Sequence, residues 1–207
     1  MADKYSLMHD VDKAIIQVPD FPRKGITFLY MNPVYGDAKT LRDLVIWADQ
    51  ELGEPRETKI VVPEARAYIL GGAIAAKRGK GIVPIRKAGK TPVNTVGVKY
   101  EREYGPEQLE LDPSLIKKGD EVVIFDDVRA TGNTDLACAS LVQEAGGKVR
   151  GFLSIAEISF LKPMENIKRE YPNAFVKSLL RYVQTEDFIA PGCKKLGFID
   201  DREIGNI

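Results

Sequence analysis

This sequence lacks an excess of charge of either sign, and it contains very little cysteine or histidine. Its 30 Lys and Arg residues balance 30 Asp and Glu residues, so no overall charge attracts nucleic acid or a membrane surface. Any anion site must therefore be built locally. Cys138 and Cys193 do not form a CxxC motif, which is typical of a reduced, cytoplasmic protein. The single histidine, His9, makes histidine-based catalysis a poor explanation.

Long hydrophobic runs and the common nucleotide motifs are also missing. No segment approaches the roughly 20 apolar residues of a membrane span, and the start MADKYSLMHD lacks the apolar core of a signal peptide. We therefore expect a cytoplasmic protein without membrane partners. No GxGxxG follows a predicted strand, and the GKT of residues 89–91 lacks the earlier glycine of a P-loop, because Pro84 stands there.

Apolar periodicity predicts strands that alternate with helices. Helices are expected over residues 8–18, 38–52, 67–79, 134–147 and 161–171. Strands are expected over residues 59–63, 81–85, 120–127, 148–158 and 174–180. Residues 86–105 have no stable period and predict a long, mobile loop with short extended flanks. Residues 183–207 have no clear period either. The alternation indicates an α/β protein with a parallel sheet and helices on both faces.

The stretch VVIFDDVRATGNT, residues 122–134, places Asp126 and Asp127 at the end of a buried strand. Ligands of open parallel sheets bind at such ends, beside the N-termini of the following helices. Backbone amides, a helix dipole and the hydroxyls of Thr131 and Thr134 suit a phosphate there. Two carboxylates would repel it unless they hold the hydroxyls of an attached sugar or act through a divalent cation. The stretch therefore indicates a sugar phosphate, although capping of a turn explains an isolated acid pair equally well.

The same stretch resembles the phosphoribosyl pyrophosphate (PRPP) motif of type I phosphoribosyltransferases. Further segments are similar to the adenine phosphoribosyltransferases, in the same order and at similar separations: FPRKGITF, PEARAYILGGAIA, VPIRKAGKTP and YEREYGPEQLELDPSLIKKGDEVVIFDD. The resemblance extends from about Phe21 to Tyr182. The Thr-Gly motif is typical of the superfamily, whereas the combination of IRKAGK with YEREYG is particular to the adenine branch.

The resemblance implies a type I phosphoribosyltransferase fold, with helices around a central parallel sheet, a hood and a flexible active-site loop. We expect one domain over residues 1–182, with a base-binding hood segment in residues 1–36. Residues 183–207 would form a C-terminal extension that wraps the body or reaches a partner subunit. The implied reaction is purine salvage, in which adenine and PRPP give AMP and pyrophosphate through an oxocarbenium-like transition state.

Catalytic roles are implied for Asp126 and Asp127, which would orient the ribose hydroxyls and stabilise the cationic sugar, and for Glu103, the candidate acid or base at the purine. Mg²⁺ is implied as cofactor, held mainly by PRPP and water, with the two aspartates as candidate ligands. Further PRPP contacts are implied for Arg66, Arg86, Lys87, Lys90, Tyr104, Ala130, Thr131, Gly132, Asn133 and Thr134. The pyrophosphate loop would comprise Glu64, Ala65, Arg66 and Ala67.

Base binding is implied for Thr27, Phe28, Leu29, Arg129 and Ala130. The chain departs from the family here, because relatives commonly carry Arg-Asp where it has Leu29 and Tyr30, and an aliphatic residue in place of Arg129. An arginine beside the base would favour a carbonyl, so the same reaction on hypoxanthine, guanine or xanthine is an alternative. Asn133 and Ala67 also replace glycines of the family.

A second alternative is a protein that senses PRPP or a nucleotide without turnover. Arg66, Lys87 and Glu103 argue against it, because a sensor needs no acid or base on a loop. In the family the residue that matches Arg86 reaches the neighbouring subunit's site, which implies a homodimer. The implied ligands are thus PRPP and a purine base, with no nucleic acid.

Overall fold

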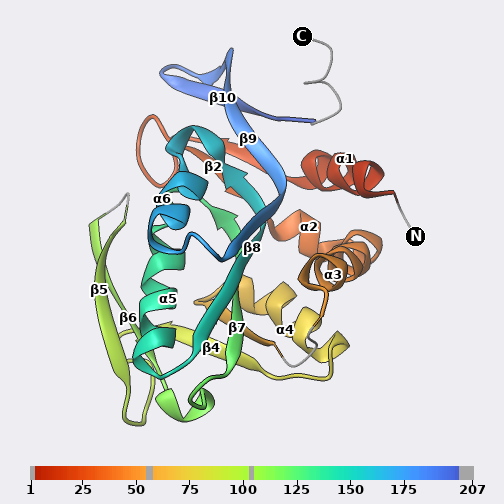
Figure 1. The fold of residues 1–207 in the computed structure, drawn as a ribbon. Coiled ribbons are helices and arrows are strands. Elements are labelled where there is room, and N and C mark those ends of the chain that lie inside the picture. Colours follow the sequence, from red (N-terminus) through yellow and green to blue (C-terminus); the bar gives the residue numbers. More distant parts are fainter. Residues whose placement is uncertain (1–2, 55–57, 103–104, 201–207) are drawn as a thin grey trace.

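The computed structural model describes residues 3–54, 58–102 and 105–200 (Figure 1). The main sheet contains β3 (Lys59–Pro63), β4 (Ile82–Lys87), β5 (Val96–Arg102), β6 (Gly105–Leu111), β7 (Glu121–Arg129), β8 (Lys148–Ile158), β9 (Phe175–Ala190) and β10 (Cys193–Phe198). In the described part of the chain these strands form one sheet in the order β10-β9-β8-β7-β3-β4-β6-β5. Neighbouring strands from β9 to β4 are parallel, whereas β10, β6 and β5 pair antiparallel.

Helices cover both faces of this sheet. They are α1 (Lys4–Ala14), α2 (Asn32–Gly36), α3 (Ala38–Leu52), α4 (Ala67–Lys77), α5 (Asn133–Glu144) and α6 (Pro163–Glu170), with short 3-10 helices η1 (Pro113–Leu115) and η2 (Ser159–Leu161). Ile60 and Val62 of β3 belong to the core with α3 and α4, whereas Val61 joins the core with α5. Successive strand side chains point to opposite faces, so a continuous apolar run fills both cores. The predicted α/β class is confirmed.

The predicted helix over residues 8–18 is wrong at its C-terminal end. Helix α1 ends at Ala14, and Ile16–Pro19 forms β1, which pairs antiparallel with β2 (Thr27–Tyr30). Ile16 and Val18 are β-branched and prefer extended backbone once a partner strand is available. That partner, β2, comes from residues for which neither a helix nor a strand was expected. Together β1 and β2 form a small separate sheet, the hood.

The expectation of a long loop over residues 86–105 is also wrong for most of its length. β5 and β6 form an antiparallel hairpin that joins the sheet through β4. Val96, Val98 and Tyr100 alternate along β5 and pack against the core beneath α5. Intervening glycine and charged residues obscured this period-2 pattern, which indicates a half-buried strand.

Residues beyond 182 are not irregular. β9 continues to Ala190, and β10 returns beside it. β10 then binds the hood, because Gln17 Nε2 donates to Leu196 O at 2.6 Å and Thr27 Oγ1 donates to Lys194 O at 2.6 Å. The C-terminal hairpin of β9 and β10 thus extends the main sheet at the top of Figure 1, and its strand β10 contacts β1 and β2. No helix within the described ranges has both the length and the apolar character needed to cross a membrane.

Helix α4 approaches the sheet most closely at Gly71. A Cβ atom there would lie 2.3 Å from Val62 Cγ1 and 3.5 Å from Phe125 Cδ1, whereas one on Gly72 would meet nothing within 4 Å. We expect Gly71→Ala to lower the free energy of unfolding by about 1–3 kcal/mol, because the core is overpacked. The control Gly72→Ala should be neutral or add up to about 1 kcal/mol, because alanine favours helix. Urea denaturation measures both, and equal stabilities would contradict the close packing.

Candidate active site

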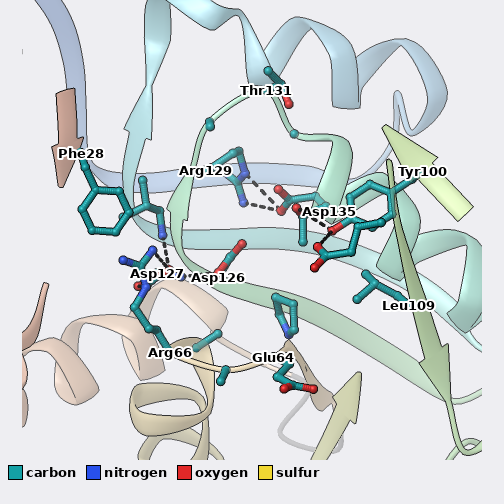
Figure 2. Close-up of a pocket in the computed structure, with 18 residues that line it drawn as sticks. Phe28, Glu64, Arg66, Tyr100, Leu109, Asp126, Asp127, Arg129, Thr131 and Asp135 are labelled. Carbon is teal, nitrogen blue, oxygen red and sulfur yellow. Dashed lines mark hydrogen bonds and ion pairs between the residues drawn. The ribbon is translucent and has the colours of Figure 1, made fainter. Parts of the chain in front are cut away.

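A cavity of about 310 Å³ opens where β3 and β7 end. Its wall comes from four parts of the chain: the end of β7 with the following loop, segment 64–67 between β3 and α4, the β5–β6 hairpin, and Phe28 of the hood. Figure 2 shows these side chains around one space. The carboxyl ends of parallel strands meet at one edge of the sheet, so the topology brings predicted residues together here.

Asp127 is held by Arg66 across the floor of this cavity. Arg66 Nε lies 2.7 Å from Asp127 Oδ2, and Arg66 Nη2 donates to Asp127 Oδ1 at 3.3 Å, so the ion pair is bidentate. The Asp127 carboxylate is 3% exposed and also accepts from the Val128 N–H at 2.8 Å. Tyr35 O–H donates to Oδ2 at 3.4 Å, and burial together with the Asp127 charge raises the pKa of this phenol. Asp127 is therefore fixed in place.

Asp126 has a different environment from its neighbour. Its Oδ1 accepts from the Asp127 N–H at 2.8 Å, and Figure 2 shows its carboxylate on the cavity side of β7. Burial, the negative charge of Asp127 and that of Asp135 raise the pKa of Asp126 well above its ordinary value of 3.8. An ionised carboxylate here attracts a cation, so the position suits a positive charge that develops on a ligand.

The loop over residues 130–134, called here the phosphate loop, turns directly into α5. Gly132 has a left-handed backbone with φ +84°, and a Cβ there would come within 3.2 Å of Pro163 O. Asn166 of α6 donates to Thr131 O at 3.1 Å, so α6 supports the loop from behind. Ala130, Thr131, Gly132 and Thr134 line the cavity, whereas Asn133 is not part of the lining described. The N-terminus of α5 therefore faces space that an anion can enter.

The pyrophosphate segment, Glu64 to Ala67, lines the same cavity from the opposite side. Glu64 turns toward the neighbouring strand, because its Oε2 accepts from the Lys87 N–H at 3.0 Å and lies 3.8 Å from Arg86 Nε. Arg66 also lies 5.0 Å from the ring centroid of Phe28. Its guanidinium thus connects this segment with the hood and with Asp127.

Glu110 orders the cationic segment that follows β4. Its carboxylate, 7% exposed, accepts from the backbone N–H groups of Gly89 (2.9 Å), Lys90 (2.9 Å) and Thr91 (2.7 Å). These bonds, with that from Gly89 first, lower the pKa of Glu110 below its ordinary value of 4.5. The loop around Lys90 is therefore held by an internal anion.

The predicted cations of this segment lie outside the described lining of the cavity. Lys87 Nζ instead contacts Glu107 Oε1 at 2.7 Å, and Arg86 Nη1 donates to Lys90 O. Glu103 and Tyr104 lie outside the residues that the structure describes, so their predicted roles stay predictions.

A second cavity, of about 250 Å³, shares Phe28, Arg66, Val128 and Ala130 with the first. Its other walls come from Thr27 and Leu29 of the hood and from the C-terminal hairpin, through Gln184, Lys194 and Leu196. Phe28 and Leu29 make it largely apolar, as a planar base requires. The predicted base-binding residues of the hood and Ala130 thus meet in one place.

Arg129 does not share that place, although sequence reasoning grouped it with the base. Its side chain is buried, and its guanidinium contacts Asp135 at 3.1 Å. Sequence reasoning also missed Tyr35, Tyr100 and Asp135 as neighbours of the site. Asp135 directly follows the ATGNT stretch, so its position in the sequence could have indicated that it lies near the site. Tyr35 and Tyr100 come from distant segments, and no motif indicates that they lie there.

The fold thus offers a helix N-terminus for a phosphate, an acid pair for a cationic sugar, and an arginine for a departing anion at one end of a parallel sheet. This combination at the carboxyl ends of parallel strands, with helices on both faces of the sheet, matches the type I phosphoribosyltransferase fold of the solved structures.

Comparisons with known proteins narrow this class. The chain is 40% identical over 161 residues to the adenine phosphoribosyltransferase of Thermosipho melanesiensis, which covers 78% of this chain and 92% of the relative. The solved adenine phosphoribosyltransferase of Thermoanaerobacter pseudethanolicus matches with a TM-score of 0.78 and 35% identity, over 84% of this chain and 99% of that chain. The Saccharomyces cerevisiae structure, complexed with an imino-altritol bisphosphate and adenine, has a TM-score of 0.76 and 31% identity, over 85% and 99%. No family model matches. The chain belongs to the adenine phosphoribosyltransferase family.

Asp126 should destabilise the folded protein at neutral pH, because its pKa is raised on folding. Stability is then highest below the ordinary value of 3.8 and falls as the pH rises through the raised value. Asp126→Asn can still accept the Asp127 N–H. We expect it to melt at a higher temperature than the original protein at pH 7, with the difference lost on acidification, in calorimetry across pH.

Asp120 supplies a control of opposite sign. The ion pair with Lys59 at 2.7 Å, then the hydrogen bond from the Lys117 N–H, lowers the pKa of Asp120. Asp120→Asn should therefore melt at a lower temperature at neutral pH, and its deficit should disappear as the pH falls through the lowered value. A neutral-pH melting temperature of Asp126→Asn below that of the original protein would contradict the buried environment of Asp126.

Proposed function

We propose that the chain is a purine salvage enzyme that transfers the phosphoribosyl group of PRPP to adenine and releases AMP and pyrophosphate. The observation that carries the proposal is the acid pair beside the phosphate loop, with Asp127 fixed by Arg66 and Asp126 turned to the cavity. The relatives named above are adenine phosphoribosyltransferases, and the yeast structure was solved with adenine and a bisphosphate. The names of these relatives and the ligands of the yeast structure support adenine as the base.

Each part of the cavity has a task in this reaction. The phosphate loop binds the 5′-phosphate through backbone amides and the Thr131 and Thr134 hydroxyls. Asp126 and Asp127 orient the ribose hydroxyls, and the charge of Asp126 stabilises the oxocarbenium-like sugar as the bond to pyrophosphate lengthens. Arg66 lies on the opposite wall and binds the departing pyrophosphate oxygens. Arg86, Lys87, Lys90 and Tyr104 complete the PRPP contacts.

The base lies in the second cavity, against Phe28 and Leu29. Ala130 lines both cavities, so a base bound there would lie next to the sugar site. Glu103 adjusts the proton on the purine, because alkylation at one ring nitrogen requires a proton change at another. This role rests on the YEREYG resemblance.

Magnesium fits the residues present. Among the described residues no group of three or more His, Cys, Asp and Glu side chains forms a metal cage. Mg²⁺, however, commonly uses one or two carboxylates together with substrate phosphates, and Asp126 and Asp127 offer them. When bound, the ion neutralises phosphate charge on PRPP. Because Asp127 is engaged by Arg66, Asp126 is the more available ligand.

Two further parts of the proposal concern assembly and location. A homodimer in which Arg86 contributes to the partner's site follows from the family resemblance. Arg86 is half-exposed and has its Nε 3.8 Å from Glu64, so it can change partners. A cytoplasmic location follows from the composition. The domain limits 1–182 and 183–207 also stay predictions, and the boundary falls inside β9.

The alternative of a 6-oxopurine substrate loses its main support. It depended on an arginine beside the base, and the Arg129 guanidinium is instead bound to Asp135. Leu29 lines the second cavity, and its apolar side chain offers no hydrogen-bond donor to the carbonyl of a 6-oxopurine. The sensor alternative is not favoured either, because the relatives matched are named as transferases.

The direct test incubates the purified protein with PRPP, Mg²⁺ and one of adenine, hypoxanthine, guanine or xanthine. We expect AMP and pyrophosphate from adenine. In a mixture of the four bases, AMP should be the main nucleotide product. Preference for a 6-oxopurine would move the function to that branch. Binding of PRPP without product from any base would instead indicate a sensor.

Replacing both acids tests the electrostatic role. Asp126→Asn/Asp127→Asn should fold but lose several orders of magnitude in turnover, since such terms contribute about 3 kcal/mol or more. Asp120→Asn, which changes an acid far from the cavity lining, should keep normal turnover. Steady-state kinetics and circular dichroism measure both properties. Near-normal turnover in the double variant would remove the aspartates from the mechanism.

A further inference from the structure

We propose that Arg129 is a positioning residue for the phosphate of the substrate: its ion pair with Asp135 ties together the two ends of the phosphate loop and offsets a negative charge beside it. The inference rests on the proposed function, because it concerns the same site. It assigns a task to an arginine at a position where relatives usually carry an aliphatic residue.

The pair closes the phosphate loop at its base. Arg129 is the last residue of β7, and Asp135 lies in the first turn of α5. Arg129 Nε and Nη2 donate to Asp135 Oδ1 at 3.2 Å and 3.1 Å, and both side chains are 1% exposed or less (Figure 2). The five loop residues therefore leave the strand and enter the helix over a fixed separation.

The guanidinium is itself anchored to the sheet. Its Nη1 donates to Lys177 O at 3.3 Å and to Ser178 Oγ at 3.2 Å, both on β9. Ser178 Oγ in turn contacts Glu157 Oε2 at 3.0 Å and Ser154 Oγ at 2.8 Å, on β8. Arg129 is thus bonded both to β9 and to Asp135 of α5, so it fixes the N-terminus of α5 relative to the central strands.

The charge of Asp135 makes this pairing matter for a phosphate. Asp135 lines the same cavity as Thr131, Gly132 and Thr134. An unpaired carboxylate at this position would oppose the helix dipole and repel an anion on the loop. The influence of Asp135 already reaches Asp126, whose pKa it raises after burial and Asp127 have done so more strongly. Arg129 offsets this charge at close range.

Variants of the two residues should move phosphate affinity in different directions. Arg129→Met leaves Asp135 buried and unpaired, so we expect the KM for PRPP to rise about tenfold or more, with the KM for adenine nearly unchanged. Asp135→Asn keeps an oxygen that accepts from Arg129 but removes the negative charge, so its KM for PRPP should stay within about twofold or fall. The double variant Arg129→Met/Asp135→Asn should recover most of the loss.

Arg181→Met is the matched control. Arg181 pairs with the buried carboxylate of Glu157 at 3.3 Å, in the same polar network but outside the lining of the cavity. This change should lower the melting temperature, as Arg129→Met does, yet leave the KM for PRPP at its original value. If Arg129→Met fails to fold, Arg129→Lys and the double variant supply the comparison, because each avoids an unpaired Asp135.

A second readout keeps this inference separate from the proposed function. Ribose 5-phosphate should raise the melting temperature of the original protein and of Asp135→Asn, but raise that of Arg129→Met less at equal ligand concentration. Arg129→Lys should give an intermediate rise, because an ammonium can pair with Asp135 but cannot also make the guanidinium's bonds to β9. A protein that binds ribose 5-phosphate without turnover on any base would refute the function alone. Equal stabilisation of all variants, or equal rises of the KM for PRPP in Arg129→Met and Arg181→Met, would overturn the inference and leave the pair a purely structural contact.

Discussion

One guanidinium, that of Arg66, holds together three of the four parts of the chain that line the cavity. It pairs with Asp127 at the end of β7, belongs to the segment that follows β3, and lies over the ring of Phe28 in the hood. A carboxylate that is 3% exposed requires such a partner, because an unpaired buried charge is strongly unfavourable. The segment after β3 must therefore lie beside β7, and the hood must meet both.

Two of the three aspartates in the described lining of the cavity are each paired with an arginine. Asp127 pairs with Arg66, and Asp135 pairs with Arg129. Asp126 instead accepts a hydrogen bond from a backbone N–H, and burial and the neighbouring acids raise its pKa. Two acids are thus fixed by the protein, and the third is left for the ligand. The neighbours Asp126 and Asp127 therefore differ: the fixed carboxylate of Asp127 gives the cavity a rigid geometry, whereas the charge of Asp126 can change when a ligand binds.

The sequence predicted the inner part of the fold because local pattern decides it. The continuous apolar runs of β3 and β7 can fill two cores only as central parallel strands, and the Thr-Gly motif after Asp127 marks the phosphate loop. The hood strand β1, the β5–β6 hairpin and the end of β9 escaped prediction. β1 and the end of β9 are strands because β2 and β10 pair with them, and glycine and charged residues obscure the alternation along β5.

In the site, too, local motifs predicted some features, whereas others depend on tertiary packing. Asp126, Asp127 and Arg66 were identified from motifs, but their pairing depends on the packing of two loops, which no local spacing reveals. Arg129 was assigned to the base site from the family resemblance. Its side chain instead turns to Asp135 and Ser178, a direction set by the buried face of β7 and by acceptors on β9. A strand's alternation fixes which face a side chain takes, and only the tertiary structure supplies its partner.

The attachment of β10 to the hood affects the order in which a growing chain becomes competent. Gln17 bonds to a residue 179 positions later, and Thr27 to one 167 positions later. The phosphate loop and its acids leave the ribosome long before β10 does. During synthesis, the second cavity can therefore be completed only after nearly the whole chain has left the ribosome, because Lys194 and Leu196 of β10 form part of its wall.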